Sequence, residues 1–333
     1  MDQLNRIGVI GGGSWATAIV KILLDNPQKK TISWWMRNKD AIAHIRTYHR
    51  NPNYLSAVEL SSEIFISDSL ESVIERSDIL VLNVPAAFVH EVLSSLPSHL
   101  FQNKIWVSAV KGIIPETNQI VAEYLHSHYR VDLDQIVVIS GPCHAEEVSQ
   151  ARLSYLTLAS VQHNAGKCLS NLMRTSYIMT TLSEDIYGTE YSAVLKNIYA
   201  VASGICHGVG FRDNFQAVLI SNAIQEMERF VDAVHPINRD IKESAYLGDL
   251  LVTAYSQYSR NRTFGNMIGK GYSARSAQLE MNMIAEGYYA SKCIYEINQR
   301  YQVDMPICKA VYTILYEHKH PLDAMKILAE QLS

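Results

Sequence analysis

Lys196 and Asn197 stand at the centre of an otherwise apolar helical stretch, residues 190–204, EYSAVLKNIYAVASG. At 3.6 residues per turn, the residues that share a face with the lysine are small or polar: Ser192, Ala193, Tyr199, Ala200 and Ser203. An unpaired buried lysine is costly. This stretch therefore suits either a catalytic amine or a lysine that is paired with a carboxylate or reaches water.

A second candidate for chemistry is the run Ser259-Arg260-Asn261-Arg262, within residues 247–265. Arginine offers a planar fork of donors, and serine and asparagine add a hydroxyl and an amide, a set that suits a phosphate. Gly248-Asp249 precedes the helix that this run is predicted to end. A basic last helical turn and a capping role for Asp249 remain as structural alternatives.

The third candidate is a glycine turn, Gly11-Gly12-Gly13-Ser14-Trp15-Ala16, between a strand-like and a helical segment. In this G-x-G-x-x-A pattern Gly11 permits the tight turn and Gly13 lets a pyrophosphate approach the backbone. The anion then rests on the helix N-terminus. The pattern predicts binding of NAD or NADP, because it follows the first strand and opens the first helix.

Arg37 stands where a carboxylate for the ribose hydroxyls of NAD would be expected, at the end of TISWWMR. An arginine can stack on adenine and pair with a 2′-phosphate. It tolerates NADP and does not exclude NAD. Trp34 and Trp35 are candidates for cofactor contact, although alternating sheet faces make at least one of them a core residue.

Three further segments lie at the ends of predicted strands: residues 83–87, 109–112 and 140–147. The carboxyl ends of strands are where open α/β sheets bind ligands. Lys111 lies at such an end, and SGPCHAEE offers a further glycine turn whose free amides suit a substrate.

The elements that position these residues change in type near residue 185. Before it, β-rich runs such as RIGVIG, DILVLNVP and LSYLTLAS alternate with helical patterns, and after it all segments are helical, including residues 282–301. We predict an α/β, Rossmann-like, doubly wound and mostly parallel sheet over residues 1–187, followed by an all-α domain over residues 188–333. Lys196 is predicted to open the first helix of the second domain, at a seam suited to a ligand.

Composition limits the classes of function. The chain has 333 residues, 48% hydrophobic, and a net charge of −4, which argues against a general nucleic-acid surface. No apolar signal segment or membrane span is expected, and we predict a cytoplasmic protein with no membrane insertion. His318 and His320 have no further ligands nearby, so no metal site is predicted. The cysteines are odd in number and scattered, which fits a reducing compartment: Cys143, Cys168, Cys206, Cys293 and Cys308.

These motifs resemble those of the soluble bacterial NAD(P)-dependent glycerol-3-phosphate dehydrogenases. The resemblance runs in order from GGGSWATA and WWMR through VKG, SGPCHAEEV, LKNIYAVASG, LGDL, SRNRTFG and AEGYYASK to MPICKAVYTILY, nearly the whole chain. Besides the turn glycines, it implies dinucleotide contacts at Ser14, Trp15, Arg37, Lys111, Ala145, Arg260, Ile284 and Glu286. It implies substrate contacts at Lys111, Gly141, Cys143, Lys196, Asp249, Ser259, Arg260 and Asn261.

The resemblance also implies the reaction. Dihydroxyacetone phosphate and sn-glycerol 3-phosphate would be interconverted by hydride transfer for phospholipid synthesis, with Lys196 as general acid/base and Asp249 and Lys111 beside it. The chain departs from the family pattern at Gly12, where alanine is usual, at Ala16, where glycine is usual, and at Cys143, where serine is usual. A thiol is a poorer hydrogen-bond partner than a hydroxyl, so weaker substrate binding is expected.

Two alternatives remain at this point. A related 6-phosphogluconate or 3-hydroxyacid dehydrogenase would share the glycine turn and the helical second half. A non-catalytic NAD(P) sensor would keep the turn but lose the acid/base group. The apolar helical half also suggests a homodimer.

Overall fold

The computed structural model describes residues 4–281 and 284–333, which form two units. The first unit runs to Val84 and also includes Phe88–Val110 and Val121–Ile186. The second consists of Pro85–Ala87, Lys111–Ile120 and the described residues from Tyr187 onward.

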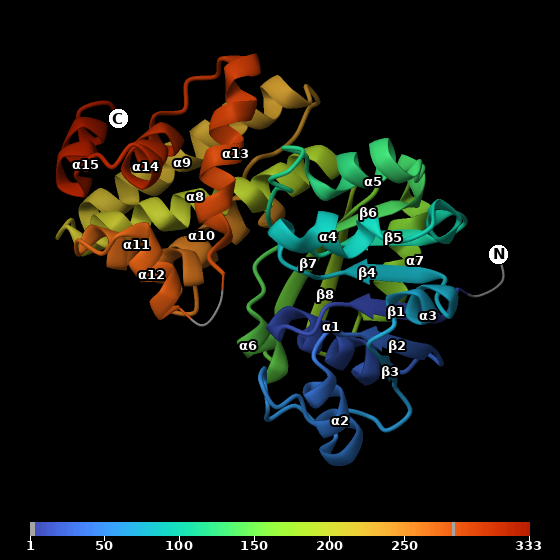
Figure 1. Ribbon diagram of the computed structural model, residues 1–333. Coiled ribbons are helices and arrows are strands. Elements are labelled where there is room, and N and C mark those ends of the chain that lie inside the picture. Colours follow the sequence, from blue (N-terminus) through green and yellow to red (C-terminus); the bar gives the residue numbers. More distant parts are fainter. Residues whose placement is uncertain (1–3, 282–283) are drawn as a thin grey trace. The chain divides into compact units, whose positions relative to one another are not determined.

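An eight-stranded sheet forms the centre of the first unit (Figure 1). Its strands are β1 (Arg6–Ile10), β2 (Thr31–Trp35), β3 (Phe65–Ser67), β4 (Ile79–Leu82), β5 (Ile105–Ser108), β6 (Ile136–Ser140), β7 (Ser154–Ala159) and β8 (Ile178–Ser183). The order is β3-β2-β1-β4-β5-β6-β7-β8, and only the β6–β7 pairing is antiparallel. The strand order therefore reverses between β1 and β4, the place where such sheets bind ligands.

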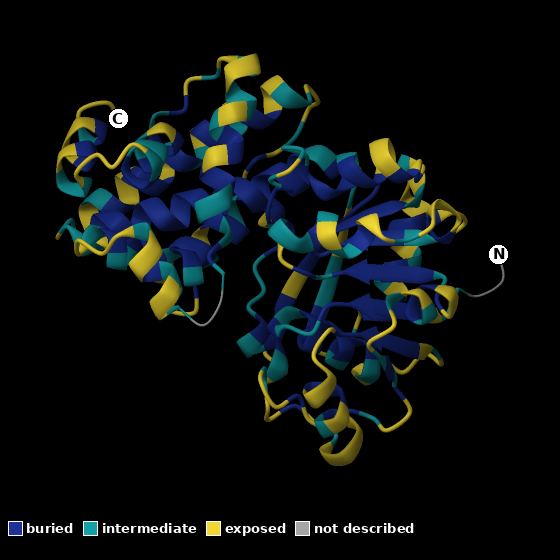
Figure 2. Cartoon of the chain, in the orientation of Figure 1, coloured by how far each residue is buried: buried dark blue, intermediate teal, exposed yellow. Residues whose placement is uncertain are grey.

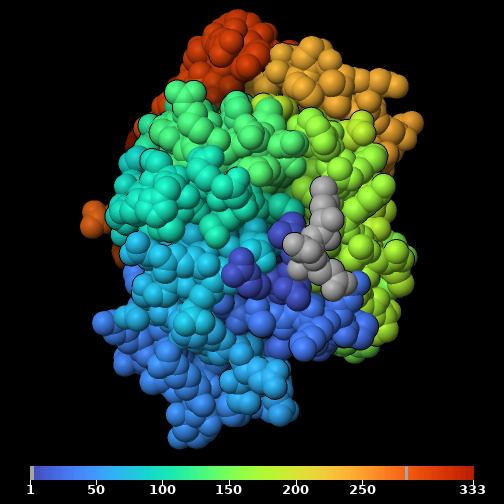
Figure 3. Space-filling model, turned by 90° about the vertical axis from the view of Figure 1, so that its right-hand side faces the viewer, coloured from blue at the N-terminus to red at the C-terminus, as the bar shows by residue number. Residues whose placement is uncertain are grey.

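Apolar side chains bury the central strands of this sheet, which are dark blue in Figure 2, whereas the edge strand β8 is partly exposed. Helices and 3₁₀ turns connect the strands: α1 (Ser14–Asp25), α2 (Lys39–Tyr48), α3 (Leu70–Glu75), η1 (Ala86–Phe88), α4 (Val89–Ser94), η2 (Ser98–Phe101), α5 (Val121–Tyr129), η3 (Leu133–Gln135), α6 (Ala145–Ser149) and α7 (His163–Met173). In the space-filling view, blue, cyan and green atoms of this unit form a closely packed surface (Figure 3). The predicted doubly wound, mostly parallel sheet is confirmed.

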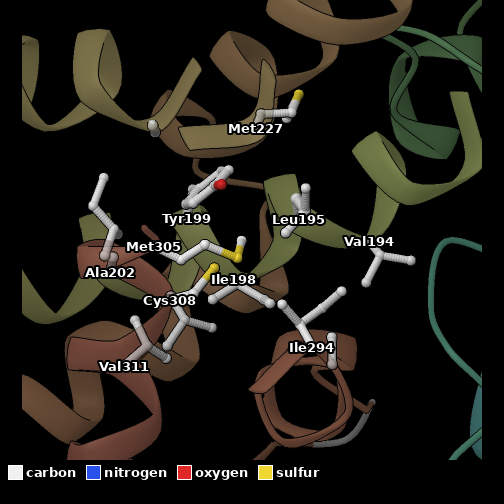
Figure 4. Packing of buried hydrophobic residues seen from close by; sticks show 14 of the residues in the cluster. Val194, Leu195, Ile198, Tyr199, Ala202, Met227, Ile294, Met305, Cys308 and Val311 are labelled. Carbon is white, nitrogen blue, oxygen red and sulfur yellow. The ribbon is translucent and has the colours of Figure 1, made fainter. Parts of the chain in front are cut away.

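The second unit is helical. Its elements are α8 (Ile186–Gly208), α9 (Asp213–Val234), the π-helical turn η4 (Ser244–Gly248), α10 (Asp249–Tyr255), α11 (Arg260–Gly269), α12 (Ala274–Glu280), α13 (Glu286–Tyr301), α14 (Pro306–Tyr316) and α15 (Pro321–Ala329). Apolar residues of α8 pack against side chains from α9, α13 and α14 (Figure 4). A long helix surrounded in this way is apolar on nearly all sides.

One buried carboxylate supports this helical core from within. Glu226 of α9 is fully buried and accepts hydrogen bonds from the backbone N–H groups of Ile307 (2.8 Å) and Cys308 (3.0 Å) at the start of α14. It satisfies donors that have no acceptor inside their own helix. Burial raises the pKa of Glu226 to about 7, although these hydrogen bonds lower it.

Helices α8 and α11 touch through their backbones. A Cβ at Gly265 would lie 2.1 Å from the carbonyl oxygen of Val201, and one at Gly204 would lie 2.1 Å from that of Arg262. Only glycine permits this approach. The two helices run in the same direction, which brings the start of α11 beside the middle of α8.

Three details differ from the sequence-based expectations. The run Ser259–Arg262 was predicted to end a helix, but Ser259 is the N-cap of α11, because α10 stops at Tyr255. Lys196 does not open its helix, since α8 starts at Ile186. The helix predicted over residues 282–301 is α13, which begins at Glu286, and Asn282 and Met283 lie outside the described residues.

Candidate functional site

The glycine turn after β1 has the conformation that its sequence predicts. Gly11 has a φ of 129°, and a Cβ there would lie 2.2 Å from the carbonyl oxygen of Asn83. A Cβ at Gly13 would meet nothing within 4 Å. Gly11 is thus required by the fold, whereas Gly13 leaves open space next to the backbone where a phosphate group fits.

Side chains from elsewhere in the first unit hold the carbonyl groups of this turn. The indole nitrogen of Trp34 donates to the Gly11 carbonyl (2.6 Å), and the amide of Asn51 donates to the Gly12 carbonyl (3.2 Å) and to Thr17 Oγ1 (2.9 Å). Trp34 and Trp35 are both buried, and Trp35 Nε1 donates to the backbone of Asp68. Both tryptophans therefore support the fold, as expected for at least one of them.

The start of α1 offers donors for a ligand. N–H groups in the first turn of a helix have no acceptor within the helix, and Ser14 and Trp15 occupy that turn. Among the residues that the structure describes, Trp15 Nε1 and Asn83 Nδ2 are buried without a hydrogen-bond partner. These two donors are thus available to an acceptor, and a dinucleotide is rich in acceptor oxygens.

Arg37 follows β2 and is exposed, with 73% of its side chain accessible. Its Nη1 lies 3.8 Å from Glu91 Oε1, and its Cζ lies 5.7 Å from the centre of the Phe88 ring. The guanidinium can stack on an aromatic ring and attract an anion.

A second glycine turn follows β6. Gly141 has a φ of 115°, and a Cβ there would lie 2.6 Å from the carbonyl oxygen of Tyr155. The thiol of Cys143 donates to the Gly141 carbonyl at 3.3 Å. Ala145 is buried and begins the short helix α6.

In the second unit, two lysines flank one carboxylate. Lys196 of α8 is 4% exposed and donates to Oδ1 of Asp249, which is 1% exposed and opens α10. Lys111 Nζ lies 3.2 Å from the other oxygen, Oδ2, of the same carboxylate. The three charges sum to +1, so this cluster attracts anions.

The charges around Asp249 also fix its ionisation. Burial favours the neutral acid, but the ammonium groups of Lys111 and Lys196 outweigh burial and hold the pKa of Asp249 below its ordinary value. Asp249 is therefore a carboxylate at neutral pH. It orients both lysines.

A chain of amide hydrogen bonds runs beside this cluster. Asn261 accepts from the Gly287 N–H (2.9 Å) and donates to Asn197 Oδ1 (2.8 Å), and Asn197 donates to the Lys111 carbonyl (2.6 Å). Asn197 and Asn261 are both buried. The chain connects α13, α11 and α8 to the segment that carries Lys111.

The predicted phosphate-binding run lies at the start of α11. Ser259 is buried, and its hydroxyl accepts from the Arg262 N–H at 3.3 Å as the helix cap. Arg260 is partly exposed at the first position of the helix. A helix N-terminus and a guanidinium both favour an anion.

Glu286 lies close enough to Arg260 for the two charges to interact. Its Oε1 accepts from the Ala86 N–H at 3.0 Å, and Oε2 is buried without a hydrogen-bond partner among the described residues. A Cβ at Gly112 would lie 2.5 Å from Oε2, so the carboxylate packs against this glycine. Burial raises the pKa of Glu286 to about 7, against the effect of the Ala86 N–H and of Arg260.

The predicted site residues thus form two groups. The first unit holds Gly11, Gly13, Ser14, Trp15, Arg37, Gly141, Cys143 and Ala145, all at or after the carboxyl ends of strands. The second unit holds Lys111, Lys196, Asp249, Ser259, Arg260, Asn261, Ile284 and Glu286. Within it, Lys111, Lys196 and Asp249 form one cluster, and Arg260 lies close enough to Glu286 for their charges to interact. Ile284 is half-buried.

Two supporting residues were not predicted as part of the site. Asn51 lies in a loop 39 residues after the glycine turn that it holds, and no local pattern indicates such a contact. Thr253 donates to the Asp249 carbonyl at 2.6 Å. It lies one helical turn after Asp249, and that spacing was the available signal.

No helix in the described part of the chain is long and apolar enough to span a bilayer.

Two family models match in succession. Residues 6–166 match the NAD-dependent glycerol-3-phosphate dehydrogenase N-terminus, and residues 185–326 match the C-terminus of the same family.

Individual relatives agree with the family models. The chain is 33% identical over 327 residues to glycerol-3-phosphate dehydrogenase [NAD(P)+] of Staphylococcus carnosus (strain TM300), and the alignment covers 98% of each chain. It is 33% identical over 323 residues to the enzyme of the same name from Bacillus thuringiensis (strain Al Hakam), covering 97% of this chain and 94% of that one. The crystal structure of the Coxiella burnetii glycerol-3-phosphate dehydrogenase superimposes with a TM-score of 0.90 at 26% identity, covering 98% of this chain and 99% of that one.

Proposed function

The chain belongs to the NAD-dependent glycerol-3-phosphate dehydrogenase family, and on that premise we propose that Lys196 is the general acid and base of its reaction. The protein is an NAD(P)-dependent oxidoreductase with NAD or NADP as its cofactor. The reaction interconverts dihydroxyacetone phosphate and glycerol 3-phosphate.

The reaction needs a proton at a defined atom. A nicotinamide cofactor held by the residues proposed below would supply the hydride for C2 of the substrate. The C2 oxygen then gains negative charge and requires a proton from the protein. We assign that proton to the Lys196 ammonium, which would return to the amine form and would accept the proton in the reverse direction.

The buried ion pair is the observation that carries this proposal. Lys196 is 4% exposed and Asp249 holds it in one orientation. A fixed ammonium in a site of low water content stabilises a developing oxyanion more strongly than one in water. Lys111, on the other oxygen of Asp249, adds positive charge beside the same carboxylate and supports the same role.

We propose that the phosphate of the substrate binds at the start of α11. Arg260 supplies the guanidinium, and the backbone there supplies helix N-terminal amides. Ser259 and Asn261 would then act partly as supports, because the Ser259 hydroxyl already caps the helix and the Asn261 amide already bonds Asn197. Gly141 and Cys143 are proposed as further substrate contacts.

For the cofactor, we propose Gly11, Gly13, Ser14, Trp15, Arg37, Lys111, Ala145, Arg260, Ile284 and Glu286 as the contact residues. The open space at Gly13 and the orphaned donor on Trp15 support the first part of this set. Oε2 of Glu286 has no hydrogen-bond partner among the described residues and can accept one from a cofactor, which supports Glu286 as a contact. Residues 1–187 would form the dinucleotide-binding domain and residues 188–333 the substrate domain.

We further propose that the enzyme supplies glycerol 3-phosphate for phospholipid synthesis, as a cytoplasmic homodimer. The second unit carries large apolar side chains that are exposed, which supports self-association: Val218, Ile237, Leu251, Tyr255, Tyr258, Tyr272, Leu279 and Ile327. Growth of a glycerol-3-phosphate auxotroph that expresses the chain tests the biosynthetic role. Light scattering of the purified protein tests the dimer.

The direct test of the activity is oxidation of NADH and of NADPH with dihydroxyacetone phosphate. Unphosphorylated dihydroxyacetone serves as the control in this direction, whereas 6-phosphogluconate and a 3-hydroxyacid, which are hydride donors, are tested by reduction of NAD⁺ and NADP⁺. Turnover only with the phosphorylated triose supports the proposed site. Equal turnover with dihydroxyacetone would remove the phosphate role, and binding of NADH without any turnover would favour the sensor.

A further inference from the structure

Arg37 and Glu91 approach each other beyond the carboxyl ends of β2 and β4, the two strands on either side of β1. The strand order places β1 between β2 and β4. Arg37 follows β2, whereas Phe88 and Glu91 lie on the turn and helix that follow β4. The guanidinium therefore reaches across the carboxyl edge of β1, beyond which the glycine turn lies.

Phe88 and Glu91 hold this guanidinium from one helical turn. Phe88 is the N-cap of α4 and Glu91 lies three residues later, in its first turn, so both side chains reach the same region. The ring is 5.7 Å from Arg37 Cζ, and the carboxylate is 3.8 Å from Nη1. The Arg37 guanidinium thus lies near both a ring and a carboxylate, while most of its side chain is exposed.

We propose that Glu91 is a specificity-determining residue that biases the enzyme toward NAD and against NADP, an inference that rests on the proposed cofactor site. A 2′-phosphate that pairs with Arg37 has to compete with Glu91 for the same guanidinium. It also has to lie near a second negative charge. The unphosphorylated ribose of NAD meets neither obstacle and leaves the contacts of Arg37 with Phe88 and Glu91 in place.

The neighbouring cation does not remove this bias. Lys39 also follows β2, but its Nζ lies 3.2 Å from Asp68 Oδ2. Both cations of the segment Arg37-Asn38-Lys39 thus have a carboxylate nearby. The net positive charge that a 2′-phosphate would meet here is therefore lower than the sequence Arg37-Asn38-Lys39 alone indicates.

The test replaces one carboxylate by its neutral isostere. In Glu91→Gln, the ratio of kcat/KM for NADPH to that for NADH is expected to rise about three- to tenfold, the size of a screened charge interaction at a few ångströms. The rise is expected to shrink below about twofold at 0.5 M salt, because exposed charges are screened. Glu63→Gln is the matched control, since Glu63 is exposed and precedes β3 at the opposite end of the strands. Its ratio should equal that of the parent.

Two further measurements separate the possible failures. In the Arg37→Ala background, Glu91→Gln should change the ratio by less than twofold, because the effect acts through Arg37. Calorimetric titration with ADP-ribose and with 2′-phospho-ADP-ribose should show the same shift in affinity without any turnover.

An unchanged ratio in Glu91→Gln, or a gain that persists without Arg37, would overturn the inference while leaving the enzyme's function intact. Failure of the parent to bind either fragment would instead overturn the proposed cofactor site and, with it, this inference.

Discussion

Lys196 and Asp249 form a buried ion pair in which the carboxylate serves a second amine with its other oxygen. Lys196 Nζ donates to Oδ1, and Lys111 Nζ lies 3.2 Å from Oδ2. Removing one amine therefore does not leave Asp249 without a counter-charge. This makes the chemistry of Lys196 separable from the stability of the fold.

Lys196→Met is expected to lower kcat by about 10²- to 10⁴-fold, the usual contribution of a positioned acid or base. Binding of NADH should change little, since Lys111 still neutralises Asp249. Steady-state kinetics and NADH fluorescence titration measure the two quantities. Lys242→Met, a change at an exposed lysine, is the control. A kcat near that of the parent would exclude Lys196 from the chemistry.

Arg260→Ala is expected chiefly to raise KM for dihydroxyacetone phosphate, by about 10- to 100-fold, because a charge-assisted hydrogen bond contributes about 1.5–3 kcal/mol. A smaller effect on KM for the cofactor is expected through Glu286. Arg275→Ala, at an exposed position on α12, should leave both constants unchanged. An effect on kcat alone would place Arg260 outside phosphate binding.

Glu226 predicts a pH dependence of stability. Its folded pKa of about 7 lies above the ordinary value of 4.5, so its contribution to stability is present at low pH and is lost as pH rises through 7. Between those values the free energy of unfolding should fall by up to about 1.4 kcal/mol per pH unit relative to Glu226→Gln. Urea unfolding of both proteins from pH 5 to 8 measures the difference. The prediction would be contradicted if the free energies of unfolding of the two proteins changed with pH in the same way.

Gly265→Ala is expected to destabilise the protein by about 2–4 kcal/mol, because the new methyl group would overlap the Val201 carbonyl. The matched control is Thr263→Ala, an exposed position on the same helix, with an expected effect below about 0.5 kcal/mol. Thermal unfolding monitored by circular dichroism measures both. A variant as stable as the control would show that the helices separate without cost.

The fold could be predicted because its signals are local. The glycine turn and the strand alternation each lie within a few consecutive residues, and the structure bears them out. The Lys111–Asp249 contact joins residues 138 positions apart, and only the family resemblance suggested it.

The start of α11 was assigned to the wrong end of a helix for a physical reason. The break between Tyr255 and Ser259 contains no proline or glycine, so the helical pattern appears continuous. Glu91 was missed because an exposed glutamate on a helix is common. Only its distance from Arg37 distinguishes it.

The backbone contact between α8 and α11 makes the geometry of the proposed site less dependent on the side chains of the helical core. Val201 and Gly265 approach through main-chain atoms, and about one turn earlier the side chains of Asn197 and Asn261 are hydrogen-bonded. The spacing between the two helices therefore depends on a backbone contact and one amide pair. Apolar side chains on the outer faces of these helices can then be exchanged during evolution at some loss of stability, while Lys196 and Arg260 keep their separation. Sequence drift is tolerated around this pair of helices and restricted along the line where they touch.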